Sequence, residues 1–244
     1  MKRPADLSEP LSRRLNSYSL AASAAGVSLL ALAQAAEAKI VYTPRHDAIT
    51  CNQSAVWFDL NHDGTTDFWI GQYSTSSKPG TAKACWLVAS GLGSGDRIAG
   101  NQRRSHFYSA SALKAGTKIG RKSKFPNQSG AWFLAAAKCS SSGNDLKCFS
   151  SGPWAGVGTR YLGLEFTIKG KTHYGWARLH VAPTKGKANV NATLTGYAYE
   201  TVPNRPIITG KTKGPDVITL RGTSLGDLAR GAAAIPAWRH RETQ

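Results

Sequence analysis

Two strand-forming runs around a short turn constrain the fold of this chain more than any other feature. Residues 161–168 and 173–181 are rich in aromatic and aliphatic side chains, and they flank a stretch of Lys, Gly and Thr at 169–172. Two such runs with a glycine-containing turn between them predict a β-hairpin. In the second run, bulky or charged residues alternate with small or apolar ones, so the two faces of that strand are expected to differ.

Further short runs of the same kind predict strands along most of the chain. They are bounded by turn-forming residues and lie at 39–43, 56–60, 67–73, 83–88, 131–137 and 190–200. The polar stretch between 90 and 130 predicts long loops with a short strand near 105–108. We therefore expect an all-β fold, an antiparallel β-sandwich of jelly-roll-like type with long loops.

The start of the chain has the three parts of a signal peptide. Basic residues come first, an uninterrupted small and apolar run follows at 20–33, and Ala36 and Ala38 then form an A-x-A cleavage site. The alternative is a membrane anchor, but the apolar run is shorter than the ~20 residues that cross a bilayer. We expect a signal helix within residues 1–38 to be removed, so that the mature protein starts at Lys39 and is secreted, periplasmic or at the cell surface.

All four cysteines lie after this cleavage site, which is typical of disulfides in an exported protein. Cys139 and Cys148 flank a polar stretch that would let two antiparallel strands meet, so we expect them to pair with each other. Cys51 would then pair with Cys85, although the spacing alone also permits the two other pairings. A zinc site is the alternative, and no paired Cys/His spacing supports it.

One stretch has the D-x-N-x-D-G-x-x-D spacing of a calcium-binding loop. Side-chain oxygens of Asp59, Asn61, Asp63 and Asp67, with the backbone carbonyl of Thr65, would bind a structural Ca²⁺. The flanks are strand-like, and the position of the bidentate glutamate of an EF-hand is an isoleucine, so the loop is expected to cap a β-hairpin. The alternative is an ordinary Asp/Asn/Gly turn that binds nothing.

The charge of the chain bears on its partners. A net charge of +17 invites a nucleic-acid interpretation. The Lys and Arg residues, however, stand mostly singly among Gly, Ser and Thr and form no long dense patch. This distribution predicts a solvated basic surface that holds an exported protein near anionic envelope polymers. We do not expect nucleic acid as a partner.

No common catalytic signature is present. The H-E-x-x-H, G-x-S-x-G and P-loop patterns of proteases, esterases and nucleotide-binding proteins are all absent. A glycosidase needs two carboxylates at a cleft, and Glu165 and Glu200 are the only glutamates of the expected sandwich. The favoured interpretation is a protein that is not an enzyme, and the alternative is a secreted hydrolase that acts on polysaccharide.

The C-terminal part departs from the strand pattern. Several prolines predict an extended linker at 212–222, after a sandwich domain that spans 39–211. Residues 223–244 have apolar side chains at helical spacing and a basic end, which predicts a short tail helix. Because Asp227 and Arg230 interrupt this helix, we do not expect it to insert into lipid. Packing on the domain and attachment to a surface both remain open.

Five segments carry a resemblance to known proteins. They lie at 36–44, 59–68, 174–179, 196–201 and 225–241. They resemble uncharacterised exported acidobacterial proteins and, more broadly, the PEP-CTERM-type surface proteins. In that broader group a Pro-Glu-Pro motif, a membrane-crossing helix and an Arg cluster form a sorting signal, which implies processing at the cell envelope. The Pro-Glu-Pro motif is absent from this chain. The resemblance implies an envelope location and no particular activity.

The favoured function is that of an exported, non-enzymatic β-sandwich protein of the cell envelope or extracellular matrix. Its expected partners are extracellular polysaccharide or an anionic envelope polymer. Tyr174, Trp176 and Arg178 lie on one face of the expected hairpin and are candidate ligand-binding residues, since aromatic rings can stack on sugars. The alternative is that the same rings belong to the core of the sandwich.

Overall fold

The structure, a computed structural model, describes residues 39–51, 55–76, 83–104, 107–127, 130–142, 145–182 and 188–220. The expected signal peptide over 1–38 and the expected tail helix over 223–244 lie outside these residues. The described part contains strands and no helix. The all-β prediction is therefore confirmed.

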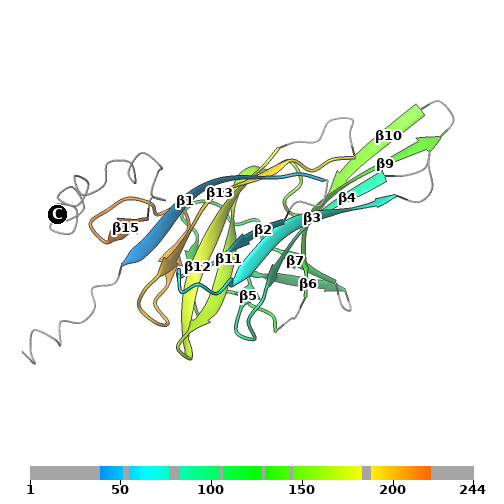
Figure 1. The fold of residues 1–244 in the computed structure, drawn as a ribbon. Coiled ribbons are helices and arrows are strands. Elements are labelled where there is room, and N and C mark those ends of the chain that lie inside the picture. The colour runs from blue at the N-terminus through cyan, green and yellow to red at the C-terminus, as the bar shows by residue number, and fades with distance from the viewer. Residues whose placement is uncertain are drawn as a thin grey trace, which may run out of the picture. The chain divides into compact units, whose positions relative to one another are not determined.

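Two sheets form the domain (Figure 1). Sheet A has, in spatial order, β15 (Val217–Thr219), β1 (Ile40–Ile49), β13 (Ala192–Glu200), β12 (Lys171–Val181), β11 (Gly158–Ile168) and β5 (Arg97–Ile98). Its neighbouring strands are antiparallel except for β1 and β15, which pair in parallel. The expected hairpin is the pair β11 and β12. Its two turn residues, Lys169 and Gly170, both have positive φ, as the tightest hairpin turns require.

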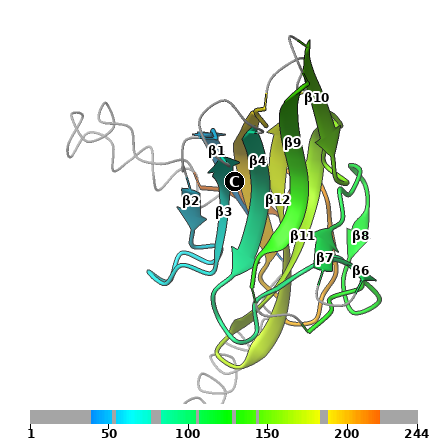
Figure 2. The same cartoon turned by 90° about the vertical axis from the view of Figure 1, so that its right-hand side faces the viewer.

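Sheet B is the second layer (Figure 2). Its strands are, in spatial order, β2 (Ala55–Phe58), β3 (Phe68–Ser76), β4 (Lys83–Gly91), β9 (Trp132–Ser142), β7 (Phe107–Ala110) and β6 (Gly100–Arg104), with β10 (Asp145–Ser151) also paired to β9. A small separate sheet pairs β14 (Ile207–Ile208) with β8 (Lys118–Ile119). The described residues between 90 and 130 thus hold four short strands, more than the single one expected.

The main core lies between the two sheets, because alternate side chains of each strand point to the same layer. Sheet B contributes, among others, Phe58, Phe68, Ile70, Leu87, Trp132 and Leu134. Sheet A contributes, among others, Ile49, Leu162, Leu164, Phe166, Leu179 and Leu194. One cluster that draws on both sheets makes the domain an antiparallel-rich β-sandwich, as predicted.

A second apolar cluster covers the outer face of sheet A. It contains Tyr42, Tyr161, Tyr174 and Trp176 from the sheet, together with Ile119 of β8 and Ile207 of β14. The small sheet therefore lies against the strands of sheet A and closes this face to solvent. Both faces of β12 are buried, one in each cluster.

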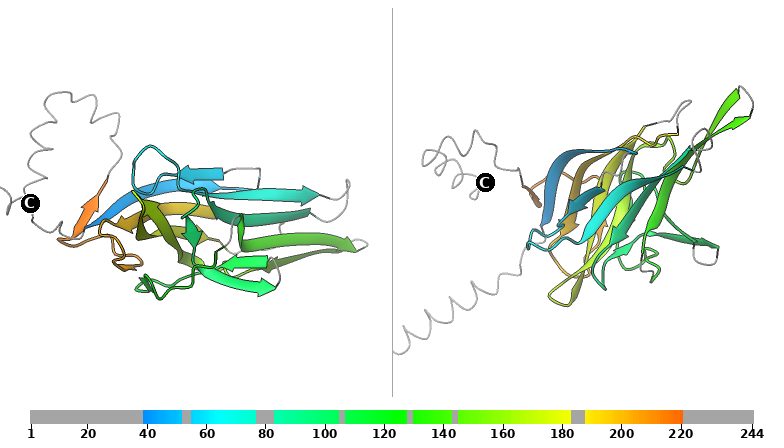
Figure 3. Two further views of the ribbon diagram at one scale, coloured as in Figure 1. Left: turned by 90° about the horizontal axis from the view of Figure 1, so that it is seen from below. Right: turned by 45° about the vertical axis from the view of Figure 1, so that its right-hand side comes forward.

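The segment expected to be a linker contains a strand. β15 runs beside β1 at the edge of sheet A (Figure 3, orange beside blue). In addition, the amide of Ile40 donates to the carbonyl of Asp216 at 2.8 Å, and the amide of Leu220 donates to the carbonyl of Tyr42 at 2.8 Å. The sandwich thus extends past Lys211, because the open edge of β1 offers backbone hydrogen bonds that an extended chain can satisfy.

Both expected disulfides are present. Cys139 and Cys148 lie directly opposite each other on β9 and β10, so their bond closes the β9–β10 hairpin. Cys51 follows β1 of sheet A, whereas Cys85 lies on β4 of sheet B, and their Cα atoms are 5.8 Å apart. This second bond joins the two sheets covalently.

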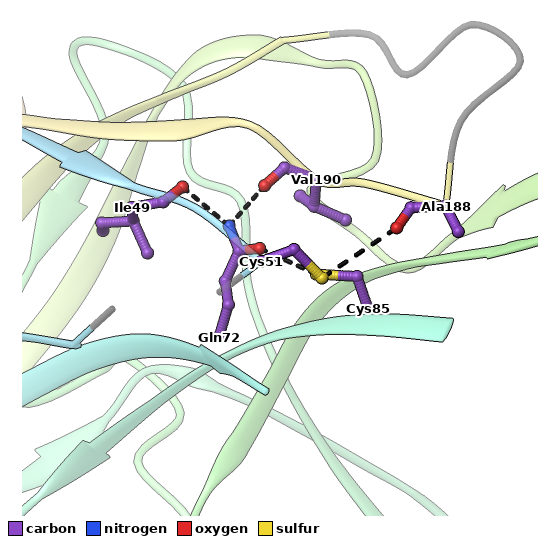
Figure 4. Close-up of a disulfide and its surroundings, with 6 residues drawn as sticks. All are labelled: Ile49, Cys51, Gln72, Cys85, Ala188 and Val190. Atoms are coloured by element: carbon purple, nitrogen blue, oxygen red, sulfur yellow. Dashed lines mark hydrogen bonds between the residues drawn. A yellow bond between two sulfur atoms is a disulfide. The ribbon is translucent and has the colours of Figure 1, made fainter. Parts of the chain in front are cut away.

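A buried glutamine lies beside the inter-sheet disulfide (Figure 4). Gln72 is on β3 of sheet B and is 5% exposed. Its Nε2 donates to the carbonyl of Ile49 at 2.9 Å and also to the carbonyl of Val190, both of which belong to the sheet A side. Its Oε1 lies 2.9 Å from Sγ of Cys85. The side-chain amide thus provides hydrogen bonds to backbone carbonyls at a place where the two sheets are not joined by backbone hydrogen bonds.

Candidate functional site

The aspartate-rich loop connects β2 to β3 and winds around the carboxylate of Asp59. The backbone amides of His62, Asp63 and Gly64 donate to this carboxylate at 2.6, 3.3 and 2.7 Å. His62 and Gly64 both have positive φ, 62° and 89°, which the tight winding requires. Glycine adopts this conformation without strain, which explains why a glycine occupies position 64.

The other acidic side chains of the loop are also bonded within it. Asp63 accepts from Nδ2 of Asn61 and from the amide of Thr65, both at 2.9 Å. Asp67 accepts from the amide of Leu60 at 2.6 Å and is only 9% exposed. Burial, together with the nearby carboxylates, raises the pKa of Asp67 to about 6, although the bond from the amide of Leu60 opposes this rise.

One of those carboxylates, Asp96, was not expected from the sequence. It lies in the turn after β4, where its carboxylate accepts from the amide of Gly93 at 2.7 Å. The amide of Leu92 donates to the carbonyl of Asp67 at 2.8 Å, so this turn runs beside the loop. Burial raises the pKa of Asp96 as well. No local sequence signal links Asp96 to the loop, because only the pairing of β3 with β4 brings them together.

The oxygen atoms of the loop decide how well it fits a cation. All its expected ligands are oxygens, which is the donor type that Ca²⁺ prefers. Oδ1 of Asn61 is buried and has no hydrogen-bond partner, so this oxygen is free to bind an ion. However, no three His, Cys, Asp or Glu side chains of the described residues lie close enough together to hold a metal. Binding would therefore require the acidic side chains of the loop to come closer together.

The loop is anchored on the opposite sheet. Leu60 is buried in the main core, and a Cβ placed on Gly175 of β12 would come within 2.9 Å of its side chain. His62 shares a hydrogen bond with Thr43 of β1 at 2.8 Å and stacks on Tyr197 of β13, with ring centroids 5.9 Å apart. A cation bound in the loop would thus stabilise the contact between the sheets.

The pKa of Asp67 leads to a prediction for the metal-free protein. Its ordinary value is near 4, so stability is expected to fall as the pH rises through the interval from about 4 to about 6, where the buried side chain ionises. In chelator, Asp67→Asn should therefore raise the free energy of unfolding by roughly 1–2 kcal/mol at about pH 7.5, with little effect at about pH 4. Urea unfolding at both pH values measures this. A substitution that is equally destabilising at both would contradict it.

The candidate ligand-binding residues of the hairpin do not form a surface site. Tyr174 and Trp176 are 2% and 0% exposed, and both belong to the second apolar cluster. Arg178 donates to Oη of Tyr42 at 3.0 Å and to Oγ1 of Thr195 at 2.8 Å. The structure thus differs from the expectation, because the small sheet covers the rings and the guanidinium has partners within sheet A.

A group of aromatic side chains, two of them exposed, lies instead on the outer face of sheet B. We call it the aromatic face, and its members are Trp57, Trp69, Tyr73, Trp86 and Phe133. Residues directly opposite on neighbouring strands share a face, and the register pairs Trp57 with Trp69 and Tyr73 with Trp86. Trp57 and Tyr73 are 55% and 46% exposed.

The rings of the aromatic face contact one another. The centroids of Trp57 and Trp69 are 5.9 Å apart, and those of Tyr73 and Trp86 are 6.2 Å apart with ring planes only 7° from parallel. Phe133 packs edge-on against Trp86 at 5.8 Å. Because rings held by neighbouring rings lose little further freedom on binding, such an array is suited to contact a ligand.

The two glutamates do not form a hydrolase site. Glu165 on β11 accepts from Arg97 at 3.0 Å, and its pKa is raised by burial while Arg97 lowers it. Glu200 on β13 is 3% exposed and accepts from the amide of Val202 at 3.0 Å. Strand β12 lies between their strands, with Tyr174 opposite Glu165. Neither carboxylate lies free at a shared cleft, which is what general acid–base cleavage of a glycoside needs.

No protein-family model, no curated protein and no solved structure matches this chain. Among the residues that the structure describes, no helix is long and apolar enough to cross a membrane.

Proposed function

We propose that this protein is an exported, non-enzymatic β-sandwich that binds extracellular polymer at the cell envelope or in the extracellular matrix. The observation that carries the proposal is the aromatic face. One outer face of the sandwich is closed by the small sheet, whereas the other presents Trp57 and Tyr73 to solvent. Exposed aromatic groups of this kind mark binding surfaces.

Two further observations support an extracytoplasmic setting. The two disulfides are of the kind that forms in oxidising compartments. The chain also begins with a segment that has the pattern of a signal peptide. The net charge of +17 would favour contact with anionic envelope polymers in that setting.

Binding of the purified, oxidised protein to a set of polysaccharides tests the proposal. Insoluble cellulose and chitin, and soluble alginate and polygalacturonate, cover neutral and anionic polymers. We expect at least one to retain the protein, with no release of reducing ends. Release of reducing ends would favour the alternative, a polysaccharide hydrolase, and a failure of every polymer to bind would reject polymer binding.

We further propose that the loop from Asp59 to Asp67 holds a structural Ca²⁺. The ligands would be oxygens of Asp59, Asn61, Asp63, Thr65 and Asp67. The ion would neutralise the buried carboxylate of Asp67 and fix the loop against sheet A. Its role would be structural, since the imidazole of this loop, His62, is bonded to Thr43 and stacked on Tyr197.

A thermal melt with and without calcium tests the metal site. At a free Ca²⁺ concentration of about 100 times Kd, binding to the folded state adds about 2.7 kcal/mol of stability, so the midpoint should rise by several degrees. Asp63→Ala should abolish the shift, whereas Asp216→Ala, a carboxylate outside the loop, should keep it. Equal midpoints with calcium and with chelator in the unsubstituted protein would mean that the loop is an ordinary turn.

A further inference from the structure

We infer that the aromatic face binds β-1,4-linked glycans, whose pyranose rings form a flat ribbon. The inference rests on the proposed function, because it names the binding site and the class of polymer. The reasons lie in the placement of the rings, in the few charged side chains on the strands that carry them and in the small side chains between them.

The two ring pairs lie one after the other along β3. Trp69 and Tyr73 lie on the same face of β3, with Gly71 between them. At about 3.4 Å per residue, the two ring pairs are roughly 14 Å apart along the strand, a span that a short run of linked sugars would cover. The surface thus has two stacking positions for one extended chain.

Small side chains keep the surface between the rings low. A Cβ on Gly71 would come within 3.0 Å of the ring of Trp69, so this ring lies down over the glycine. Opposite Gly71 on the neighbouring strands are Ala55 and Val88. The pyranose C–H groups of a ribbon can therefore approach the ring faces without meeting a protruding side chain, and such C–H groups interact favourably with aromatic faces.

The charge of this surface favours a neutral ligand. Strands β2, β3, β4 and β9 contain no aspartate or glutamate. Among the outward-facing residues of these four strands that the structure describes, only one is basic. It is Lys138, which is exposed and lies on β9 two positions after Ala136, the residue opposite Trp86. The basic residues that give the chain its net charge thus lie mainly elsewhere, and an anionic polymer would find little charge to pair with here.

A glycan fits this surface better than a second copy of the chain. The exposed hydroxyl of Thr75 lies on the same face of β3, two residues beyond Tyr73. A sugar ribbon has apolar ring faces and equatorial hydroxyls at its edges, so it can contact the rings and donate to this hydroxyl at once. A protein partner would have to bury the hydroxyl in an apolar contact.

The experiment is depletion of the purified, oxidised protein from solution by cellulose and by chitin, with granular starch, an α-1,4-linked helical glucan, as the control polymer. We expect binding to at least one of the two ribbons, little change between low and high salt, and no binding to starch. Trp57→Ala and Tyr73→Ala should each weaken binding about tenfold, because each removes one stacking position.

Two control variants and a comparison of melting temperatures separate stacking from other effects. Tyr73→Phe keeps the ring and should bind like the unsubstituted protein. Ile218→Ala removes an exposed apolar side chain from β15, a strand of sheet A, and should also bind normally. Because Trp57 and Tyr73 are about half exposed, their alanine variants should melt within a few degrees of the unsubstituted protein, which shows that lost binding is not lost folding.

Other outcomes would overturn the inference. Binding only to alginate or polygalacturonate, with steep salt dependence and no effect of Trp57→Ala, would keep the proposed polymer binding but reject this site and this polymer class. Equal binding to starch would reject the requirement for a flat ribbon. A dimer that Trp57→Ala dissociates in sedimentation equilibrium would assign the face to a second copy. No binding to any polymer would reject the proposed function itself.

Discussion

Trp176→Ala is expected to lower the free energy of unfolding by about 3–5 kcal/mol. The indole is fully buried between sheet A and the small sheet, where it packs against Tyr42 and Tyr161 with ring centroids 5.8 and 5.3 Å away. Alanine would leave a cavity that the surrounding strands cannot fill. Urea unfolding followed by far-UV circular dichroism measures the loss without depending on tryptophan fluorescence.

Trp57→Ala is the matched control, because it removes the same side chain from an exposed position. We expect a change of no more than about 1 kcal/mol for this variant. Equal effects of the two substitutions would mean that the small sheet does not cover the outer face of sheet A. In that case Tyr174 and Trp176 would again be candidates for a surface site.

Loss of the bond between Cys51 and Cys85 is expected to have an effect of similar size. The two residues are 34 positions apart in sequence, and closing a loop of that length in the unfolded chain corresponds to about 4 kcal/mol in the chain-entropy description. The bond also holds the end of β1 beside Gln72, whose amide bridges the two sheets. The double substitution Cys51→Ala, Cys85→Ala should therefore lower the free energy of unfolding by about 4 kcal/mol in urea.

The second disulfide provides an internal comparison. Cys139 and Cys148 are only 9 positions apart and already face each other in a hairpin, so removing their bond should cost about 3 kcal/mol or less. The order of the two effects is the informative result. If the hairpin bond matters more than the inter-sheet bond, the contact between β1 and β4 does not depend on the covalent link.

Most of the features that the sequence predicted correctly are those that neighbouring residues determine. The hairpin turn needs positive φ at two successive positions, and the local pattern around Gly170 supplies it. The pairing of Cys139 with Cys148 follows from two strands that meet across a short turn. The strands themselves follow from runs of aromatic and β-branched side chains, although the sequence underestimated the number of short strands between 90 and 130.

The winding of the aspartate loop also has a local cause. Asp59 accepts from amides three to five residues further along, and Gly64 permits the turn that these bonds require. Asp96, in contrast, reaches the loop only because β4 pairs with β3. Its position after a different strand gave no indication of this contact.

Whether the aromatic side chains of a strand are buried or exposed is not determined by neighbouring residues. Trp176 on β12 and Tyr73 on β3 follow the same alternating pattern, so the sequence around each predicts two-faced strands and nothing more. In the folded protein Trp176 is covered because Ile119 and Ile207, distant in sequence, bring the small sheet against sheet A. No segment among the described residues covers Tyr73 in the same way. Period and turn chemistry arise from adjacent residues, whereas burial of a face depends on which remote segment packs against it, and only the tertiary structure decides that.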